Sequence, residues 1–189
     1  MATEERFTLT VPTGYACPEA AFIIAQLDDQ SALLLEAVRD ITPEELEWQP
    51  GRGMNSIGML LAHNAIVEVV WSQAAAGEPV DTARILGLDA FEGDGMPLPP
   101  DAEPPAHLAG KPFAYYVDLL ERARAFARDH AQRITAADLD TIRTRTRRNG
   151  QRQEFSVRWV LYHMLEHFAG HHGQMLLLRH QYAARRVNV

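Results

Sequence analysis

Apolar residues recur at intervals of three and four positions along four long stretches of this chain. That spacing places them on one face of an α-helix, so each stretch is predicted to be an amphipathic helix. The stretches are residues 18–40, 56–77, 112–134 and 156–181. Capping residues support these boundaries, because Asn55 or Ser56 can cap the second helix and Ser156 can cap the fourth. Thr42 begins a capping box that predicts a short helix, which Pro50 ends.

The segments between these helices differ in length and composition, and both properties bear on the topology. The connection 77–110 is rich in glycine and proline, and its length allows the third helix to run parallel to the second. Over residues 140–155 threonine alternates imperfectly with arginine, and Asn149-Gly150 is typical of a type I′ turn, so we expect a small β-hairpin or an extended excursion. We predict an all-α fold, a four-helix bundle with a long crossover between helices two and three and a hairpin before the last. It would form a single domain over residues 1–189, with an extended N-terminal arm at 1–17.

Composition and charge exclude several classes of protein. Of the 189 residues, 47% are hydrophobic and 23% are charged, which excludes a wholly disordered chain, and the one cysteine excludes an internal disulfide framework. The net charge of −7 disfavours binding to nucleic acids, which depends on neutralisation of phosphates by a basic surface. No apolar run reaches the roughly 20 residues of a membrane helix, and the N-terminus lacks the apolar region of a signal peptide. We expect a cytoplasmic protein with neither nucleic-acid nor membrane partners.

Five of the eight histidines lie between His163 and His180, in the last predicted helix. His163, His167 and His171 are spaced by four residues, so neighbouring members share one face of the helix. Two such imidazoles can bind one metal ion, as in the helical pair of the HExxH motif. Residues i and i+8 are about 12 Å apart along a helix axis, so all three histidines cannot easily reach one ion. A third ligand should therefore come from another helix.

His63 is the candidate for that third ligand. It lies in the middle of the second predicted helix, in an apolar stretch where a histidine must be desolvated and needs a partner. We predict a metal site on His63, His167 and His171, and three histidines that leave positions open are typical of a catalytic site. A histidine buried alone is more often only hydrogen-bonded, and His163 stays open as a rival ligand or an accessory residue. His172 points about 100° away from His171 and is expected outside the site.

Other polar residues leave two interpretations open. Glu68 and Glu166 could each orient a ligand histidine or act as a base, although a solvated or dimer-facing carboxylate is the commoner role. The arginines between Arg143 and Arg152 could capture an anionic substrate, although charges that protect an edge strand are commoner. His130 is expected to be an ordinary surface or helix-end histidine.

Four features together resemble the DinB/YfiT-like superfamily over residues 20–179. They are Asp40-Ile41-Thr42-Pro43-Glu44-Glu45-Leu46 with Trp48-Gln49-Pro50, the run from Ser56-Ile57 through Leu60-Leu61-Ala62-His63 to Glu68 and Trp71, the long crossover, and His167-Phe168-Ala169-Gly170-His171-His172-Gly173-Gln174. The last motif is fairly specific, because it is similar to the family signature of two histidines four apart, a basic residue, glycine and glutamine. The family often has arginine after the second histidine, whereas this chain has His172.

The resemblance implies a four-helix bundle, often dimeric, with a metal ion on His63, His167 and His171, and zinc and nickel are the metals usual in the family. Some relatives are thiol-dependent isomerases or S-transferases that use mycothiol or bacillithiol. The leading hypothesis is therefore a metal-dependent thiol S-transferase or isomerase that acts on a small-molecule substrate with a low-molecular-weight thiol. The alternatives are a non-catalytic, stress-associated homodimer with a structural or vestigial histidine site, and a metal-dependent hydrolase, because fold does not decide activity.

Overall fold

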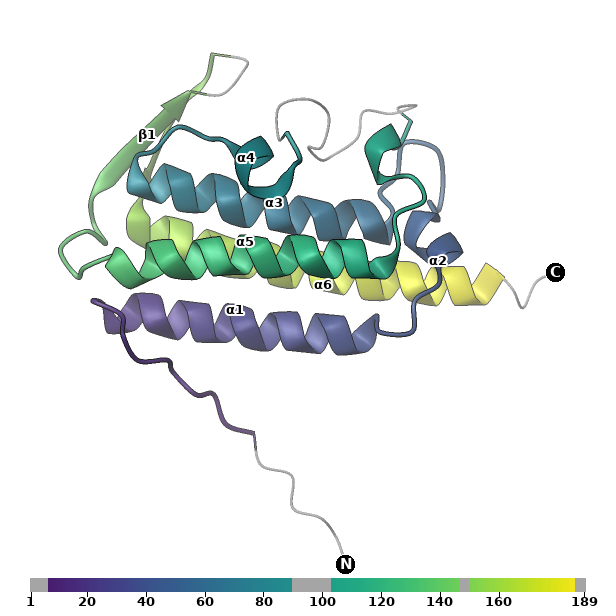
Figure 1. The fold of residues 1–189 in the computed structure, drawn as a ribbon, viewed down its shortest axis with the longest axis horizontal. Helices are drawn as coiled ribbons and strands as arrows, with labels where there is room; N and C mark the ends of the chain where they lie inside the picture. The colour runs from purple at the N-terminus through teal and green to yellow at the C-terminus, as the bar shows by residue number, and fades with distance from the viewer. Residues whose placement is uncertain (1–6, 90–102, 147–149, 186–189) are drawn as a thin grey trace, which may run out of the picture.

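Four long helices pack side by side in the computed structural model, which describes residues 7–89, 103–146 and 150–185 (Figure 1). They are α1 (Pro18–Ala37), α3 (Ile57–Ala76), α5 (Phe113–Arg133) and α6 (Val157–Arg185). Helix α3 contacts α5 and α6, and α1 contacts the same two helices, so the four enclose one hydrophobic core. Helices α3 and α5 run in the same direction, which confirms the long crossover between the second and third long helices (Figure 1).

The helices begin where the capping residues predict. The side-chain oxygen of Ser56 accepts a backbone N–H at the start of α3, so Ser56 rather than Asn55 is the cap. The hydroxyl of Ser156 accepts a backbone N–H at the start of α6 in the same way. The far ends differ slightly from expectation, because α1 ends at Ala37 and α6 continues to Arg185. Helix ends are the least certain part of a prediction from periodicity, since the last turn has weaker hydrogen bonding.

The shorter elements lie in the connections between the long helices. They are α2 (Pro43–Glu47), α4 (Thr82–Leu86), the 3-10 helix η1 (Ala106–Leu108), and the strands β1 (Ile142–Thr146) and β2 (Arg152–Ser156). The crossover thus contains a short helix and a helical turn, and residues 90–102 of it lie outside the described residues. The strands pair antiparallel, from Ile142 opposite Ser156 to Thr146 opposite Arg152, which confirms the hairpin. Asn149 of the expected turn lies outside the described residues, whereas Gly150 has a φ of 80°, as such turns require.

Two features outside the bundle complete the fold. Residues 7–17, the described part of the N-terminal segment, contain neither helix nor strand. Over the ranges that the structure describes, none of the helices has the length and apolar character that crossing a membrane requires.

Candidate metal centre

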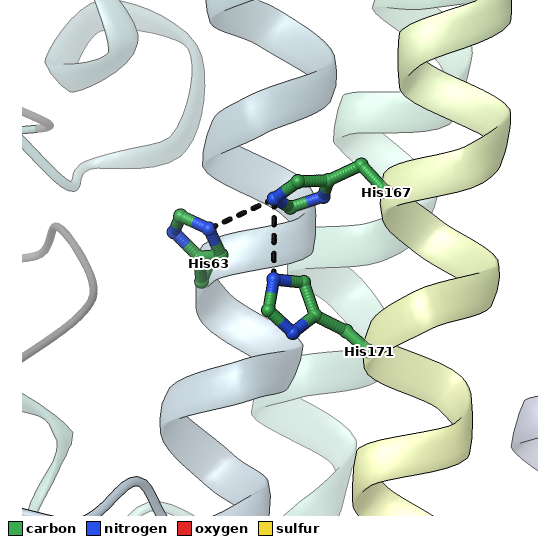
Figure 2. Close-up of side chains that lie close together, drawn as sticks. All are labelled: His63, His167 and His171. Atoms are coloured by element: carbon green, nitrogen blue, oxygen red, sulfur yellow. Dashed lines mark hydrogen bonds between the residues drawn. The ribbon is translucent and has the colours of Figure 1, made fainter.

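Three histidines from two helices meet between α3 and α6. The Nε2 atom of His167 lies 3.1 Å from Nε2 of His63 and 3.2 Å from Nε2 of His171. One ligand atom from each of the three residues lies within 4.8 Å of the others (Figure 2). The four-residue spacing aligns His167 and His171 on α6, and the packing of α3 against α6 brings His63 beside them. The structure therefore brings together the three residues that the sequence singles out.

Hydrogen bonds between the three histidines cannot give every converging nitrogen atom a partner. A neutral imidazole nitrogen carries either one proton or one lone pair, so Nε2 of His167 makes one good hydrogen bond and still faces a second nitrogen. Two nitrogens that are each about 2.1 Å from one ion, at roughly right or tetrahedral angles, lie about 3.0–3.4 Å apart. The separations of 3.1 and 3.2 Å fall in that interval, so this three-histidine group could hold a metal ion.

The protonation state of the cluster also suits a metal ligand. Burial, followed by the charge of His171, lowers the pKa of His63 to about 4. Burial, followed by the charges of His171, His63 and His163, lowers the pKa of His167 to about 3. Both rings are therefore neutral at pH 7, and a neutral imidazole is the form that binds a metal. Protons compete weakly for these two lone pairs at physiological pH.

The second ring nitrogens of these histidines have different surroundings. Nδ1 of His171 lies 2.8 Å from Oε1 of Gln174, so its N–H donates to the amide oxygen and leaves the lone pair on Nε2. Nδ1 of His63 is buried and, among the described residues, has no hydrogen-bond partner. The sequence analysis did not assign this role to Gln174. The signal that was available is its spacing of three residues from His171, which puts the two side chains on the same face.

His163 and His172 do not join the cluster. Nδ1 of His163 lies 2.8 Å from Oε1 of Glu166, and its ring stacks on Trp159 with centroids 4.6 Å apart. Glu166 therefore orients His163 and not one of the three clustered histidines. Nδ1 of His172 lies 3.5 Å from the side-chain oxygen of Gln30 on α1, so His172 faces away from the cluster, as its helical position predicts.

Glu68 has a role that the sequence analysis did not anticipate. It is only 2% exposed, and its two oxygens accept hydrogen bonds of 2.8 and 2.6 Å from the guanidinium of Arg124. The same guanidinium donates to Asp28 at 2.7 Å, which links α1, α3 and α5. Both expectations for Glu68 are therefore wrong, because its carboxylate is neither solvated nor directed at a histidine. A buried carboxylate on α3 requires a cation, and helix packing supplies it from α5.

The comparisons with known proteins identify the family and support the fold. The family model described as mycothiol-S-transferase matches residues 23–184. The chain belongs to this DinB/YfiT-like family. A crystal structure described as the conserved protein of a locus from Enterococcus faecalis is similar to this structure, with a TM-score of 0.59 and 16% identity. The similarity covers 83% of this chain and 92% of that one, and it supports the fold. The comparison with curated proteins gave no match.

This member of the mycothiol S-transferase family has a run of aromatic rings beside the three histidines, which we call the aromatic wall. It consists of Trp71, Phe155, Trp159 and His163. The ring of His163 lies 5.6 Å from that of His167, so the wall begins next to the cluster. It continues to a groove of about 480 Å³ under the hairpin, where Trp159 is 42% exposed. Trp71 and Phe155 are buried, so Trp159 is the member of the wall that presents most apolar surface to solvent.

The arginines of the hairpin do not form one anion-binding cluster among the described residues. The guanidinium of Arg143 donates to the backbone carbonyl of Ala75 at 3.0 Å. Arg145 lies 3.9 Å above the ring of Trp71, and Arg152 pairs with Glu154 on the same strand. Arg147 and Arg148 lie outside the described residues. The group predicted from the sequence is therefore divided among separate environments.

Proposed function

We propose that this protein is a metal-dependent S-transferase that joins a low-molecular-weight thiol to a small electrophilic substrate. The observation that supports this most is the convergence of three partly buried imidazoles, those of His63 and His167 neutral at pH 7, in a chain that matches the mycothiol S-transferase model. His63, His167 and His171 would hold the ion, and imidazole nitrogens suit zinc and nickel. When bound, the ion would act as a Lewis acid and lower the pKa of a thiol at an open position.

The residues around the three histidines would position the ligands and the substrate. Gln174 holds His171 in the tautomer whose lone pair faces the other imidazoles. The exposed ring of Trp159, at the open end of the aromatic wall, would give an apolar substrate a flat surface to contact. Arg145, above the ring of Trp71, supplies positive charge at the edge of the wall for an anionic group of the substrate or the thiol.

Metal content tests the proposed centre. The untagged wild-type protein and the variants His63→Ala, His167→Ala and His172→Ala would be dialysed without chelator and examined by elemental analysis. We expect about one zinc or nickel ion per chain in the wild type and in His172→Ala, and loss of the ion in the other two variants. His172→Ala is the matched control, because its imidazole lies on the same helix but faces Gln30. Full metal content in both ligand variants would contradict the assignment.

The reaction class requires a second experiment with metal-loaded protein. Mycothiol or bacillithiol would be incubated with an aromatic electrophile such as 1-chloro-2,4-dinitrobenzene, and the products would be identified by mass spectrometry. A thiol conjugate whose formation needs both thiol and His63 supports the S-transferase. Substrate cleavage that proceeds without thiol would indicate the metal-dependent hydrolase instead. A metal-loaded protein that accelerates neither reaction over a panel of electrophiles and esters would favour the non-catalytic homodimer.

A further inference from the structure

A second pocket, with a volume of about 280 Å³, lies between the C-terminal halves of α3 and α5 and the start of α6. Ser72 in its wall is about 14 Å from His63 along the axis of α3, at a rise of about 1.5 Å per residue. None of the three clustered histidines and no member of the aromatic wall lines it. We propose that this pocket binds a small carboxylate with an apolar tail.

Most of the buried side chains that line the pocket are apolar, and Ser72 is a polar exception. Its wall includes the methyl groups of Ala75 on α3 and of Ala127 and Ala131 on α5, together with Leu161 and Met164 on α6. Protein cores contain few voids larger than a water molecule, because neighbouring side chains usually fill them. Here alanines face one another where larger residues would close the space. An apolar cavity holds water poorly, so the space favours an apolar ligand over solvent.

The mouth of the pocket is polar, and its carboxylates already have partners. His130 is 8% exposed, and its Nε2 lies 3.3 Å from Oε2 of Glu78. Its Nδ1 lies 3.1 Å from the carbonyl oxygen of Phe126, which corrects the expectation of an ordinary surface histidine. Asp138 accepts hydrogen bonds of 2.8 and 2.6 Å from the backbone and hydroxyl of Thr135. Neither acidic group at the mouth therefore needs a cation from a ligand.

The arginines at the mouth differ from each other in their partners. Arg133 pairs with Asp129 at 2.6 Å, one turn away on α5. Arg143 donates its Nε–H to the carbonyl of Ala75, and among the described residues it forms no ion pair, although, after the hydrogen bonds from Thr135, its charge lowers the pKa of nearby Asp138. A guanidinium binds a carboxylate with two parallel hydrogen bonds, so Arg143 would bind the acidic head of the ligand. The apolar side chains of the pocket wall would contact the tail.

The pocket has room for a small ligand. Its volume of about 280 Å³ is near the lower end of the range for small-molecule sites, so a monocarboxylate of about six to eight carbons fits it. Octanoate is therefore the probe, and 1-octanol is the control that keeps the chain length and removes the charge.

Isothermal titration of the full-length protein with octanoate tests the proposal. We expect the wild type to bind octanoate. The affinity of Arg143→Gln should be at least about 10-fold lower, because the charge-assisted hydrogen bonds are lost. Ala131→Leu should abolish binding by filling the interior. Arg133→Gln is the matched control, since Arg133 shares the mouth but is paired with Asp129, and its affinity should stay within about 3-fold of wild type.

The possible results separate this pocket from the metal centre. His63→Ala should bind octanoate like the wild type, so failure of the S-transferase proposal leaves this one standing. No binding to the wild type at about 5 mM, or equal affinity for 1-octanol, would overturn the carboxylate site. Unchanged binding in both Arg143→Gln and Ala131→Leu would also overturn it. Circular dichroism of each variant identifies a loss of folding, and Arg143→Gln still decides the question if Ala131→Leu does not fold.

Discussion

Helix α3 carries two ionisable side chains five residues apart, a partly buried His63 and a buried Glu68, and the helices packed against it provide for them in different ways. Glu68 faces α5, where Arg124 gives both of its oxygens a hydrogen bond. His63 faces α6, where its ring nitrogens meet another imidazole on one side and no partner among the described residues on the other. The first arrangement is complete within the protein. The second is incomplete, because the Nε2 atoms of the histidines converge on one another with more lone pairs than hydrogen bonds between them can use.

This difference separates a structural role from a functional one. A buried ion pair is costly to disrupt, and it needs no ligand because each oxygen of the carboxylate already accepts a charge-assisted hydrogen bond. The converging imidazoles keep their lone pairs, which is unfavourable in the isolated chain and favourable once a cation binds. Substitutions on the two sides of α3 should therefore change different measurable quantities.

The largest effect on stability should come from Glu68→Ala. The substitution leaves the guanidinium of Arg124 buried with only Asp28 as an anionic partner, so we expect a loss of about 3–5 kcal/mol in the free energy of unfolding. Urea denaturation measures this loss, and the folded fraction should keep its metal content. The double variant Glu68→Met, Arg124→Met is the control and should recover most of the stability. Equal destabilisation in the double variant would contradict the ion-pair explanation.

Substitution of His63 should have its main effect on metal binding. In His63→Ala the metal-free protein should stay within about 1 kcal/mol of wild-type stability, because the imidazole removed has an unpartnered nitrogen. The stabilisation that added metal gives the wild type, about 2.7 kcal/mol at 100 times the dissociation constant, should disappear. Thermal unfolding with and without zinc, or after removal of metal by a chelator, measures both quantities. A large destabilisation of the metal-free variant would show that His63 is a structural residue like Glu68.

Substitution of Gln174 should reduce metal affinity less than the loss of His63. Gln174→Ala removes the acceptor that orients His171, so we expect metal affinity to fall by about 10- to 100-fold with the bundle intact. A competition titration with a chromogenic chelator measures the affinity. Gln174→Glu, which keeps an acceptor at the same distance, should retain affinity close to wild type. An unchanged affinity in Gln174→Ala would mean that the helix alone orients the imidazole.

The smallest effect should be a pH dependence of the metal-free protein. Burial first, then the charge of His171, lowers the folded-state pKa of His63 to about 4, whereas the unfolded chain binds the proton near pH 6.5. The free energy of unfolding should therefore fall as the pH decreases from about 6.5 towards 4, by at most about 1.4 kcal/mol per pH unit for each imidazole. Urea denaturation at pH 7.5, 6.5 and 5.5 checks the direction. The decrease should be smaller in His63→Ala, and an equal slope in that variant would assign it to other groups.

Residues that act within one helix could be predicted well from the sequence. The spacing of His167 and His171 depends only on helix geometry, and the caps Ser56 and Ser156 depend on hydrogen bonds between close neighbours in the chain. The hairpin and the crossover were also found, because turn residues and connection length are local properties. The choice of His63 was an inference from its apolar surroundings, and the resemblance to the family supported it.

Residues whose partner lies far along the chain were predicted less well. The roles proposed for Glu68 were wrong because Arg124 is 56 positions away, and no local pattern pairs the two. The expectation that His130 is an ordinary surface or helix-end residue was also wrong, because its partner Glu78 is 52 positions away in the sequence. The second pocket could not be foreseen at all, since it depends on alanines from different helices facing one another.

The sequence by itself determined the four helices, their order, the crossover and the pair of imidazoles on α6, because these follow from periodicity, capping and connection length. Only the tertiary structure decided which face of α3 meets which neighbour. That choice places His63 within 3.1 Å of His167 and gives Glu68 its guanidinium. The physical reason is that local interactions act over one or two helical turns. The environment of a buried polar group, in contrast, is set by side chains that come near it only when the helices pack.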